Sequence, residues 1–309
     1  AMPSGAIKFI NYKNLTCAAL LSVIQRVVTN LQQDKIRNRL QQQLAEQTLD
    51  SQKKQLEGKV ISVYSPRGGT GVSTVVANLG TVIKESKPES RVLLMDMDLQ
   101  FGDIAILFNQ FPPRSLVDLA IRIQNIDEDL IESVVFEDQT FHIDLLAPPQ
   151  KPDLATTIDP SSISTILTHL RKTYDYILIN VDSHLEESSL LALSNSDLIL
   201  LVAVQQVSAI RSLRAFMNVL SDFAISKEKV ALILNRYDEA NSITAKKIGD
   251  MLSLGVAHMI PLDVKTAEKS ANLGIPFTVD SKKSEISKSF TSLLTLVNNK
   301  LQQKEKASV

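Results

Sequence analysis

The sequence predicts an α/β protein with a doubly wound, mostly parallel sheet, preceded by a helical N-terminal extension. Two observations lead to this prediction. From Lys59 onward, short and unbroken apolar runs alternate with amphipathic helical stretches, which is the pattern of a parallel sheet covered by helices on both faces. The first apolar run also leads directly through a glycine-rich turn into a helix, as βαβ units do.

Composition bounds the class of protein before any motif is considered. The chain has 309 residues, 44% of them hydrophobic, and carries 33 basic and 34 acidic side chains for a net charge of −1. This balance gives no general attraction to nucleic acid or to an anionic membrane, although a local charged patch stays an alternative. We therefore expect no nucleic-acid partner, and we expect any membrane contact to be indirect. The single cysteine, Cys17, excludes an internal disulfide and is typical of a reducing compartment. The sequence therefore predicts a soluble, cytoplasmic protein.

The first 58 residues differ in kind from the rest. Residues 1–28 contain a short apolar run followed by a stretch with helical periodicity, and residues 29–58 are rich in Gln, Lys, Arg and Glu without any proline. We interpret residues 29–58 as a helical linker and residues 59–309 as one large α/β domain. The opening Ala1-Met2 is typical of a cloning scar and suggests a piece of a longer protein.

Within the α/β domain, periodicity predicts alternating strands and helices. The expected strands are residues 60–65, 92–95, 142–147, 176–181, 198–202, 230–235 and 256–260. The clearest expected helices are residues 73–84, 161–172, 207–224 and 242–252. Near the C-terminus, Ile286, Phe290, Leu293, Leu294 and Val297 form an apolar stripe at helical spacing. The stripe either closes the domain against the sheet, which we favour, or binds a membrane surface.

The glycine-rich turn has most of the features of a phosphate-binding loop. It reads Ser-Pro-Arg-Gly-Gly-Thr-Gly-Val-Ser-Thr over residues 65–74. Glycines let successive backbone N–H groups point at an anion, and the following helix adds the positive end of its dipole. Ser73 stands at the position of the Mg²⁺-binding hydroxyl. However, Pro66 replaces the first glycine and Val72 the lysine of the usual pattern, so a turn that only joins strand to helix is the alternative.

Polar residues follow three of the predicted strands. Asp96 and Asp98 lie at the end of the second strand, and their spacing directs both carboxylates to one side of it. This edge of an open α/β sheet is where ligands bind, although both residues could instead cap the next segment. Asn180 with Asp182, and Asn235, stand at or beyond the ends of two later strands. Asn235 could also be a simple turn former.

These motifs together resemble one family. Residues 67–74 look like the deviant phosphate loop of the MinD/ParA superfamily of P-loop NTPases, and in particular that of its CpaE/TadZ branch of pilus-assembly and localisation proteins, where the lysine is often absent. Residues 93–103, Leu-Leu-Met-Asp-Met-Asp-Leu-Gln-Phe-Gly-Asp, are very similar to the second motif of that branch. Residues 145–149 and 174–176 match further landmarks, and the resemblance covers about residues 59–298.

The resemblance implies ATP and Mg²⁺ as ligands. The residues expected around the phosphates are Arg67, Gly68, Gly69, Thr70, Gly71, Val72, Ser73 and Thr74, and those expected around the base are Asn235, Arg236, Pro261 and Asp263.

The same resemblance assigns the catalytic and metal-binding positions. Asp98 would orient the attacking water, and Asp96 would lie near the metal and its waters. Ser73 would bind Mg²⁺, with Asp96, Asn180 or Asp182 acting through water. Asn180 occupies the position of the usual metal-binding aspartate but carries no charge, so the strength of metal binding is in question.

Two substitutions affect the expected activity. Position 72 carries valine where the usual pattern has lysine, and position 180 carries asparagine where it has aspartate. We therefore expect slow or absent hydrolysis, because phosphoryl transfer depends on neutralising the charge of the transition state. The resemblance implies a nucleotide-sandwich homodimer in which Arg67 reaches the partner's phosphates. Alternatively, Arg67 pairs with Asp96 or Asp98.

The resemblance therefore implies an ATP-responsive homodimeric scaffold that assembles or positions a type IV/Flp pilus or Tad secretion machine at the cell pole. Its expected partners are a second copy and pilus or Tad components such as the secretion ATPase. Residues 1–28 resemble the last strand and helix of a receiver domain, although a dimerising helix is the alternative. Two other functions stay open: an active MinD/ParA-type ATPase for spatial positioning, and a response-regulator output module with a vestigial nucleotide site.

Overall fold

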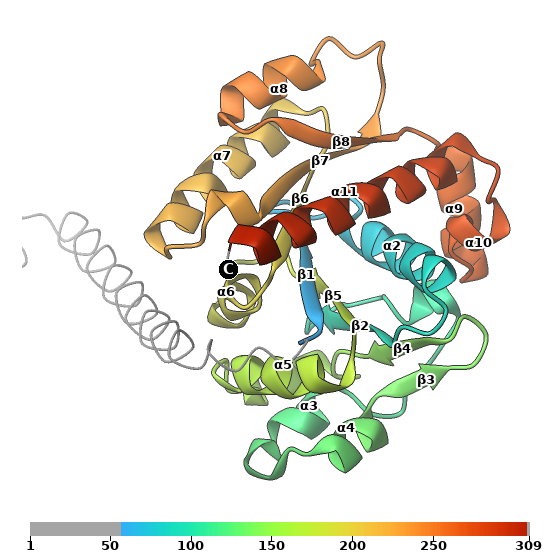
Figure 1. Ribbon diagram of the computed structural model, residues 1–309, viewed down its shortest axis with the longest axis vertical. Coiled ribbons are helices and arrows are strands. Elements are labelled where there is room, and N and C mark those ends of the chain that lie inside the picture. The colour runs from blue at the N-terminus through green and yellow to red at the C-terminus, as the bar shows by residue number, and fades with distance from the viewer. Residues whose placement is uncertain (1–56, 308–309) are drawn as a thin grey trace, which may run out of the picture. The chain divides into compact units, whose positions relative to one another are not determined.

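The computed structural model describes residues 57–307, and its described part contains one eight-stranded sheet (Figure 1). The strand order is β3-β4-β2-β5-β1-β6-β7-β8. Every neighbouring pair is parallel except β3 with β4. The strands are β1 (Lys59–Tyr64), β2 (Val92–Met97), β3 (Phe136–Asp138), β4 (Ile143–Leu146), β5 (Tyr176–Val181), β6 (Leu198–Ala203), β7 (Val230–Tyr237) and β8 (Val256–Pro261). The predicted mostly parallel sheet is confirmed.

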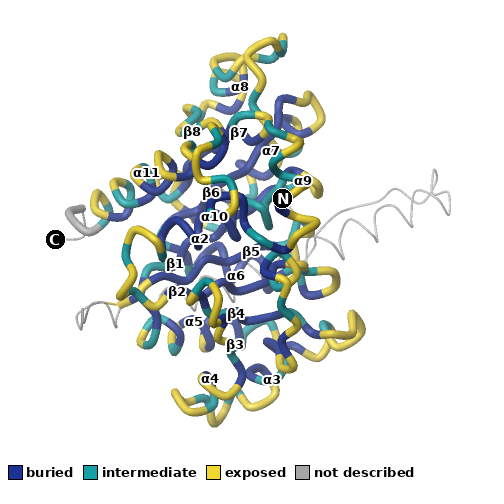
Figure 2. Tube along the Cα trace, turned by 90° about the vertical axis from the view of Figure 1, so that its right-hand side faces the viewer, coloured by how far each residue is buried: buried dark blue, intermediate teal, exposed yellow. Residues whose placement is uncertain are grey.

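The central strands form the core because their apolar runs are buried on both faces. Every residue of β2, β5 and β6 is buried, and Figure 2 shows these strands as the dark blue centre of the domain. The expected strand at residues 142–147 is shorter, since β4 covers only Ile143–Leu146. The sequence analysis did not predict β3, because three residues at the edge of a sheet give no clear alternation.

Helices cover both faces of this sheet. Contacts place α2, α9, α10 and α11 on one face and α3 to α8 on the other (Figure 1). The α-helices are α2 (Val72–Ser86), α3 (Leu116–Ala120), α4 (Glu128–Val134), α5 (Ser162–Thr173), α6 (Glu187–Ser194), α7 (Val207–Asp222), α8 (Ala245–Leu252), α9 (Val264–Leu273), α10 (Phe277–Asp280) and α11 (Glu285–Ala307). The short 3₁₀ helices are η2 (Ile106–Phe108), η3 (Ile123–Asn125), η4 (Pro152–Thr157) and η5 (Lys227–Lys229).

The apolar stripe near the C-terminus lies on α11 and packs into the core. Its five residues are each at most 5% exposed, and α11 contacts α2, β6 and β8. The rings of Phe277 and Phe290 meet edge to face, with centroids 5.3 Å apart. The interpretation that this helix closes the domain is confirmed, because the stripe is not available to a membrane. No helix in the described residues is both long and apolar enough to span a bilayer.

The described residues begin at the end of the predicted linker. The predicted receiver-like segment, residues 1–28, lies outside the described residues, as does nearly all of residues 29–58. The chain enters β1 through Gly58, whose N–H donates to the Arg171 carbonyl at 2.8 Å. A Cβ at this position would lie 1.8 Å from the Tyr174 carbonyl oxygen, so only glycine fits here.

A partly buried carboxylate, that of Asp197, fixes the position of this entry point. It lies just before β6 and accepts hydrogen bonds from the Val60 N–H at 2.9 Å, the Arg171 guanidinium at 2.7 Å and the Lys304 ammonium at 2.6 Å. Burial alone would raise the pKa of Asp197, but the charges of Arg171 and Lys304 outweigh it and lower the pKa to about 2. One side chain thus joins β1, α5 and α11.

We expect Asp197→Asn to lower the free energy of unfolding by about 3 kcal/mol, because it leaves two cations beside a neutral side chain. Since the folded-state pKa is depressed, the stabilisation is complete above the ordinary value of 3.8 and is lost as the pH falls toward 2. Urea unfolding at several pH values measures both effects. Glu85→Gln, which removes an exposed ion pair with Lys282, is the control and should change stability by about 0.5 kcal/mol or less. Equal losses in the two variants would contradict this role for Asp197.

Candidate functional site

The glycine-rich loop joins the carboxyl end of β1 to the first turn of α2, as predicted. Gly69 and Gly71 have φ values of 74° and 94°, a backbone region that favours glycine. Gly71 is the N-cap of α2, and no side chain caps this helix. None of the backbone N–H groups of residues 67–71 has a hydrogen-bond partner within the described chain. Unpaired N–H groups at the start of a 15-residue helix form a cradle for an anion.

Asn235 holds this loop in place. Its side-chain amide donates to the Thr70 carbonyl at 2.8 Å, and both residues are buried. The amide lies so close that a Cβ on Gly71 would stand 2.3 Å from Asn235 Nδ2. Glycine is therefore required at position 71 both for its φ and for this contact. Asn235 ends the apolar part of β7, and this position brings its side chain to the loop, a contact that the sequence analysis did not predict.

Val72, which stands at the lysine position, and Arg67, which was expected to reach a partner's phosphates, lie in different surroundings. The Val72 side chain is partly buried against the hydrophobic core. Arg67 is exposed and lines an open cavity of about 860 Å³ at the start of α7. Within the described residues, Arg67 makes no ion pair with Asp96 or Asp98. The alternative pairing considered from the sequence is therefore not found.

A chain of hydrogen bonds runs from the loop helix into the sheet. Ser73 Oγ donates to Asn180 Oδ1 at 3.4 Å, and Asn180 Nδ2 donates to Asp96 Oδ1 at 2.7 Å. Asp96 and Asn180 stand opposite each other in the pairing of β2 with β5. Asp96 is 1% exposed, and Asn180 is 3% exposed. Ser73, which was expected to bind Mg²⁺, is thus connected to Asp96 through Asn180 by two successive hydrogen bonds.

Asp96 also anchors the loop that follows β2. Its carboxylate accepts from the Asp98 N–H at 3.1 Å and from the Ile104 N–H at 3.0 Å. Burial raises the pKa of Asp96 to about 7, against the opposing effect of these bonds and of the Asn180 amide. A Cβ on Gly102 would lie 2.5 Å from Asp96 Oδ2, so a glycine at this position makes room for the carboxylate.

Asp98 is less enclosed than Asp96. It lies one residue beyond β2 and is half-buried, with its carboxylate accepting from the Phe101 N–H at 3.0 Å. Burial raises the pKa of Asp98, and the nearby charges of Asp182 and Asp103 raise it further. Asp182 follows β5 and accepts from the His184 N–H at 3.2 Å. The structure therefore brings Asp98 and Asp182 into one acidic region at the carboxyl edge of the sheet.

The residues expected around a base converge on a second cavity beside the loop. This cavity measures about 310 Å³, and its lining includes Gly71, Thr74, Asn235, Arg236, Pro261, Leu262, Asp263, Val264 and Phe277. The Asp263 carboxylate caps α9 by accepting from the Thr266 N–H at 3.0 Å, which lowers its pKa. The sequence analysis did not name the apolar lining residues Leu262, Val264 and Phe277, because their positions follow only from the packing of α9 and α10.

The residues present fit a nucleotide with its Mg²⁺. The unpaired N–H groups of residues 67–71 suit phosphate oxygens, and the adjoining 310 Å³ cavity can take a base. Among the described residues, no cluster of three or more His, Cys, Asp or Glu side chains could hold a metal ion alone. Ser73 Oγ would supply one protein ligand, and Mg²⁺ commonly completes its shell with phosphate oxygens and waters. Bound Mg²⁺ would neutralise phosphate charge at this position.

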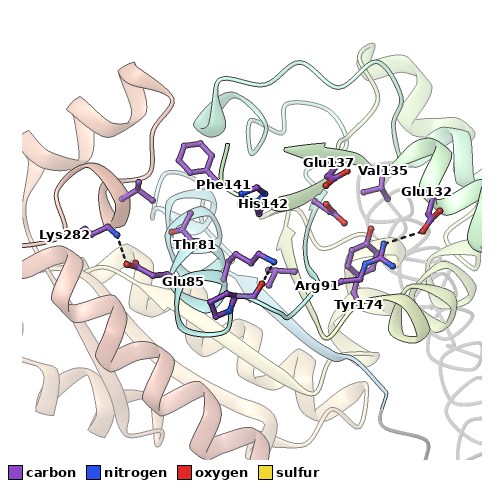
Figure 3. Close-up of a pocket in the computed structure, with 15 residues that line it drawn as sticks. Thr81, Glu85, Arg91, Glu132, Val135, Glu137, Phe141, His142, Tyr174 and Lys282 are labelled. Carbon is purple, nitrogen blue, oxygen red and sulfur yellow. Dashed lines mark hydrogen bonds and ion pairs between the residues drawn. The ribbon is translucent and has the colours of Figure 1, made fainter. Parts of the chain in front are cut away.

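A larger cavity lies apart from this site. It measures about 1030 Å³ and is lined from the last turns of α2, the start of β2, the β3–β4 hairpin and Tyr174 (Figure 3). Arg91 lies over the Tyr174 ring, 4.9 Å from its centroid, and pairs with Glu132 at 3.8 Å. Lys282 pairs with Glu85 at 2.6 Å at the other end. No residue of the glycine-rich loop lines this cavity, and no sequence motif predicted it.

The fold and the loop define a P-loop nucleotide-binding protein. The family model for the AAA domain (AAA_31) matches residues 58–232. The septum site-determining protein MinD of Thermotoga maritima is 28% identical over 241 residues, which make up 76% of this chain and 86% of that protein. The chain belongs to this AAA domain family, in the MinD/ParA group of P-loop ATPases.

Solved structures show the same fold. The crystal structure of a ParA family ATPase from Chlorobium tepidum TLS has a TM-score of 0.72 at 22% identity, and the match covers 76% of this chain and 98% of that one. MinD from Pyrococcus horikoshii OT3, complexed with Mg-ADP, has a TM-score of 0.66 at 22% identity over 76% of this chain and 94% of that one. These likenesses confirm the α/β P-loop fold predicted from the sequence.

Gly71→Ala should destabilise the protein more than Gly69→Ala, although both glycines have positive φ. At Gly69 a new Cβ meets nothing within 4 Å, so only the backbone strain of about 1–2 kcal/mol is expected. At Gly71 the Cβ also displaces the Asn235 amide, and the lost buried hydrogen bond raises the total to about 3–4 kcal/mol. Urea unfolding of both variants measures the difference. Equal losses would show that Asn235 does not hold the loop.

Proposed function

We propose that this chain is an ATP-binding, ATP-responsive dimer with slow or absent hydrolysis. One observation carries the proposal: the backbone phosphate cradle is complete, while the residues that would neutralise phosphate charge are substituted. Unpaired N–H groups and Ser73 are in place, whereas Val72 packs against the core and Asn180 brings no charge. The Mg-ADP complex of the Pyrococcus horikoshii MinD supports ATP and Mg²⁺ as the ligands.

The two substitutions affect hydrolysis more than binding. A lysine would contribute a charge-assisted hydrogen bond of about 1.5–3 kcal/mol to the phosphates, so its loss weakens binding roughly ten- to a hundredfold. The backbone cradle stays in either case, since it does not depend on that side chain. In the transition state more charge must be stabilised than in the bound nucleotide, and positions 72 and 180 supply none. Asp98, whose pKa is raised, is the candidate we name for orienting the attacking water.

Exposed apolar side chains support the dimer. Six of them follow the carboxyl ends of strands, on the edge of the sheet that carries the loop. They are Phe101, Leu154, Leu185, Val207, Leu262 and Val264, with exposed fractions from 37% to 74%. Apolar surface gathered at one edge favours association. Arg67, exposed beside the loop, is free of carboxylate partners in the described chain and suits the phosphates of a second copy.

We further propose that the dimer is a scaffold for type IV/Flp (Tad) pilus assembly or for its polar localisation. The resemblance of residues 67–74 and 93–103 to the CpaE/TadZ branch supports this role. Its partners would be Tad components such as the secretion ATPase.

An active ATPase for spatial positioning is the second candidate. The Thermotoga maritima relative is a septum site-determining protein, and the half-buried Asp98 is open enough to reach a water.

Titration calorimetry with ATP–Mg²⁺, light scattering and a phosphate-release assay test the proposal together. We expect binding, ATP-dependent dimerisation, and turnover near background that Asp98→Ala leaves unchanged. Arg67→Ala should weaken ATP-dependent dimerisation about tenfold or more, as the loss of a charge-assisted contact predicts. Arg122→Ala, at another exposed arginine, is the control. Brisk turnover that Asp98→Ala abolishes would establish the second candidate, and absence of ATP binding would contradict both.

A further inference from the structure

The carboxyl group nearest to Asn180 lies on the neighbouring strand, at Asp96, and does not contact Ser73 directly. Asn180 accepts from the Ser73 hydroxyl and donates to Asp96, so the amide stands between the serine and the carboxylate. The register of β2 with β5 fixes this separation, because Asp96 and Asn180 are directly opposite each other. Two of the remaining contacts of Asp96 are backbone N–H groups of the loop after β2. The carboxylate thus accepts three hydrogen bonds from protein groups.

We propose that Asn180 is the positioning residue that makes nucleotide binding by this chain nearly independent of Mg²⁺. A metal beside Ser73 meets the Asn180 amide, which brings no charge, while the charge of Asp96 is already shared among three donors. Mg²⁺ then gains little from the protein, and the nucleotide is held by the backbone cradle. This inference rests on the proposed nucleotide binding and goes beyond it, since it assigns the metal dependence to one pair of residues.

The pair also explains why aspartate cannot simply be restored at position 180. Asn180 Nδ2 and Asp96 Oδ1 are 2.7 Å apart, and both side chains are buried. In Asn180→Asp this hydrogen bond becomes a contact between two buried carboxyl groups that cannot both stay ionised at this distance, so the pair must either take up a proton or move apart. Asp96→Asn alone replaces one acceptor oxygen by an NH₂ group at a position where two backbone N–H groups and the Asn180 amide all donate, so at least one of these donors loses its acceptor.

Exchanging the two side chains preserves nearly all of the contacts. In the double variant Asp96→Asn/Asn180→Asp, the amide now on β2 can accept from the Ile104 N–H through its oxygen and donate to the carboxylate now on β5. That carboxylate can still accept from the Ser73 hydroxyl. Only the 3.1 Å bond from the Asp98 N–H loses its acceptor. The exchange therefore moves the single negative charge from β2 to β5, next to Ser73, without adding a second one.

Thermal unfolding of the nucleotide-free protein tests the pair first. We expect Asn180→Asp to lower Tm by roughly 5–10 °C and the double variant to recover to within about 3 °C of wild type. Asn125→Asp, the same change at an exposed position, is the control and should shift Tm by about 1 °C or less. A double variant no more stable than Asn180→Asp would overturn the proposal.

Calorimetry with ADP, in excess Mg²⁺ or in EDTA, tests the metal dependence. We expect Mg²⁺ to change the ADP affinity of wild type by about threefold or less, and that of the double variant by about tenfold or more. A structural role alone would not move this ratio. Equal ratios in the two proteins would overturn the inference and leave the proposed function standing. If wild type binds no ADP under either condition, the proposed function fails as well.

Discussion

The fold depends on a sheet whose central strands are buried on both faces. Strands β2, β5, β1 and β6 lie side by side in parallel, and almost every residue in them is buried. A parallel sheet needs helical crossovers on both faces, and these crossovers place the carboxyl ends of all four strands at one edge. The glycine-rich loop, Asp98 and Asp182 meet there for this reason alone. The site is thus a consequence of strand direction before any side chain contributes.

Burying a polar group at this edge of the sheet costs free energy unless the group has hydrogen-bond partners, and the buried polar groups here are hydrogen-bonded. Asp96 is enclosed by three N–H donors, and a carboxylate accepts them better than a carboxylic acid does, although burial raises its pKa to about 7. At the opposite edge, Asp197 keeps its charge because two cations face it. The first carboxylate orders a loop beside the site, and the second joins both ends of the described domain. Neither could be left unpaired at this burial.

Sequence alone predicted the parallel sheet and the glycine-rich loop, because periodicity locates the strands and the loop directly follows the first of them. The grouping of Asn235, Arg236, Pro261 and Asp263 was implied only by the family resemblance. Sequence alone did not predict β3, whose three residues carry no pattern. Nor did it predict the hydrogen bonds from the Asn235 amide to the Thr70 carbonyl and from the Asn180 amide to Asp96. These contacts depend on strand register and on side-chain rotamers. The sequence also did not predict the large cavity beyond α2, because the residues that line it come from segments scattered between Thr81 and Lys282.

Binding and hydrolysis are separable in this fold because different parts of the chain supply them. The cradle consists of backbone N–H groups set by Gly69, Gly71 and the start of α2, so substitution of neighbouring side chains leaves it intact. Charge neutralisation depends on single side chains at positions 72 and 180, and both are changed here. Under the proposed function, a chain that keeps the backbone cradle without these two charged side chains would bind nucleotide and hydrolyse it slowly or not at all. The Asn180 amide, held between Ser73 and Asp96, shows that the substituted position has acquired contacts of its own and is more than a lost aspartate.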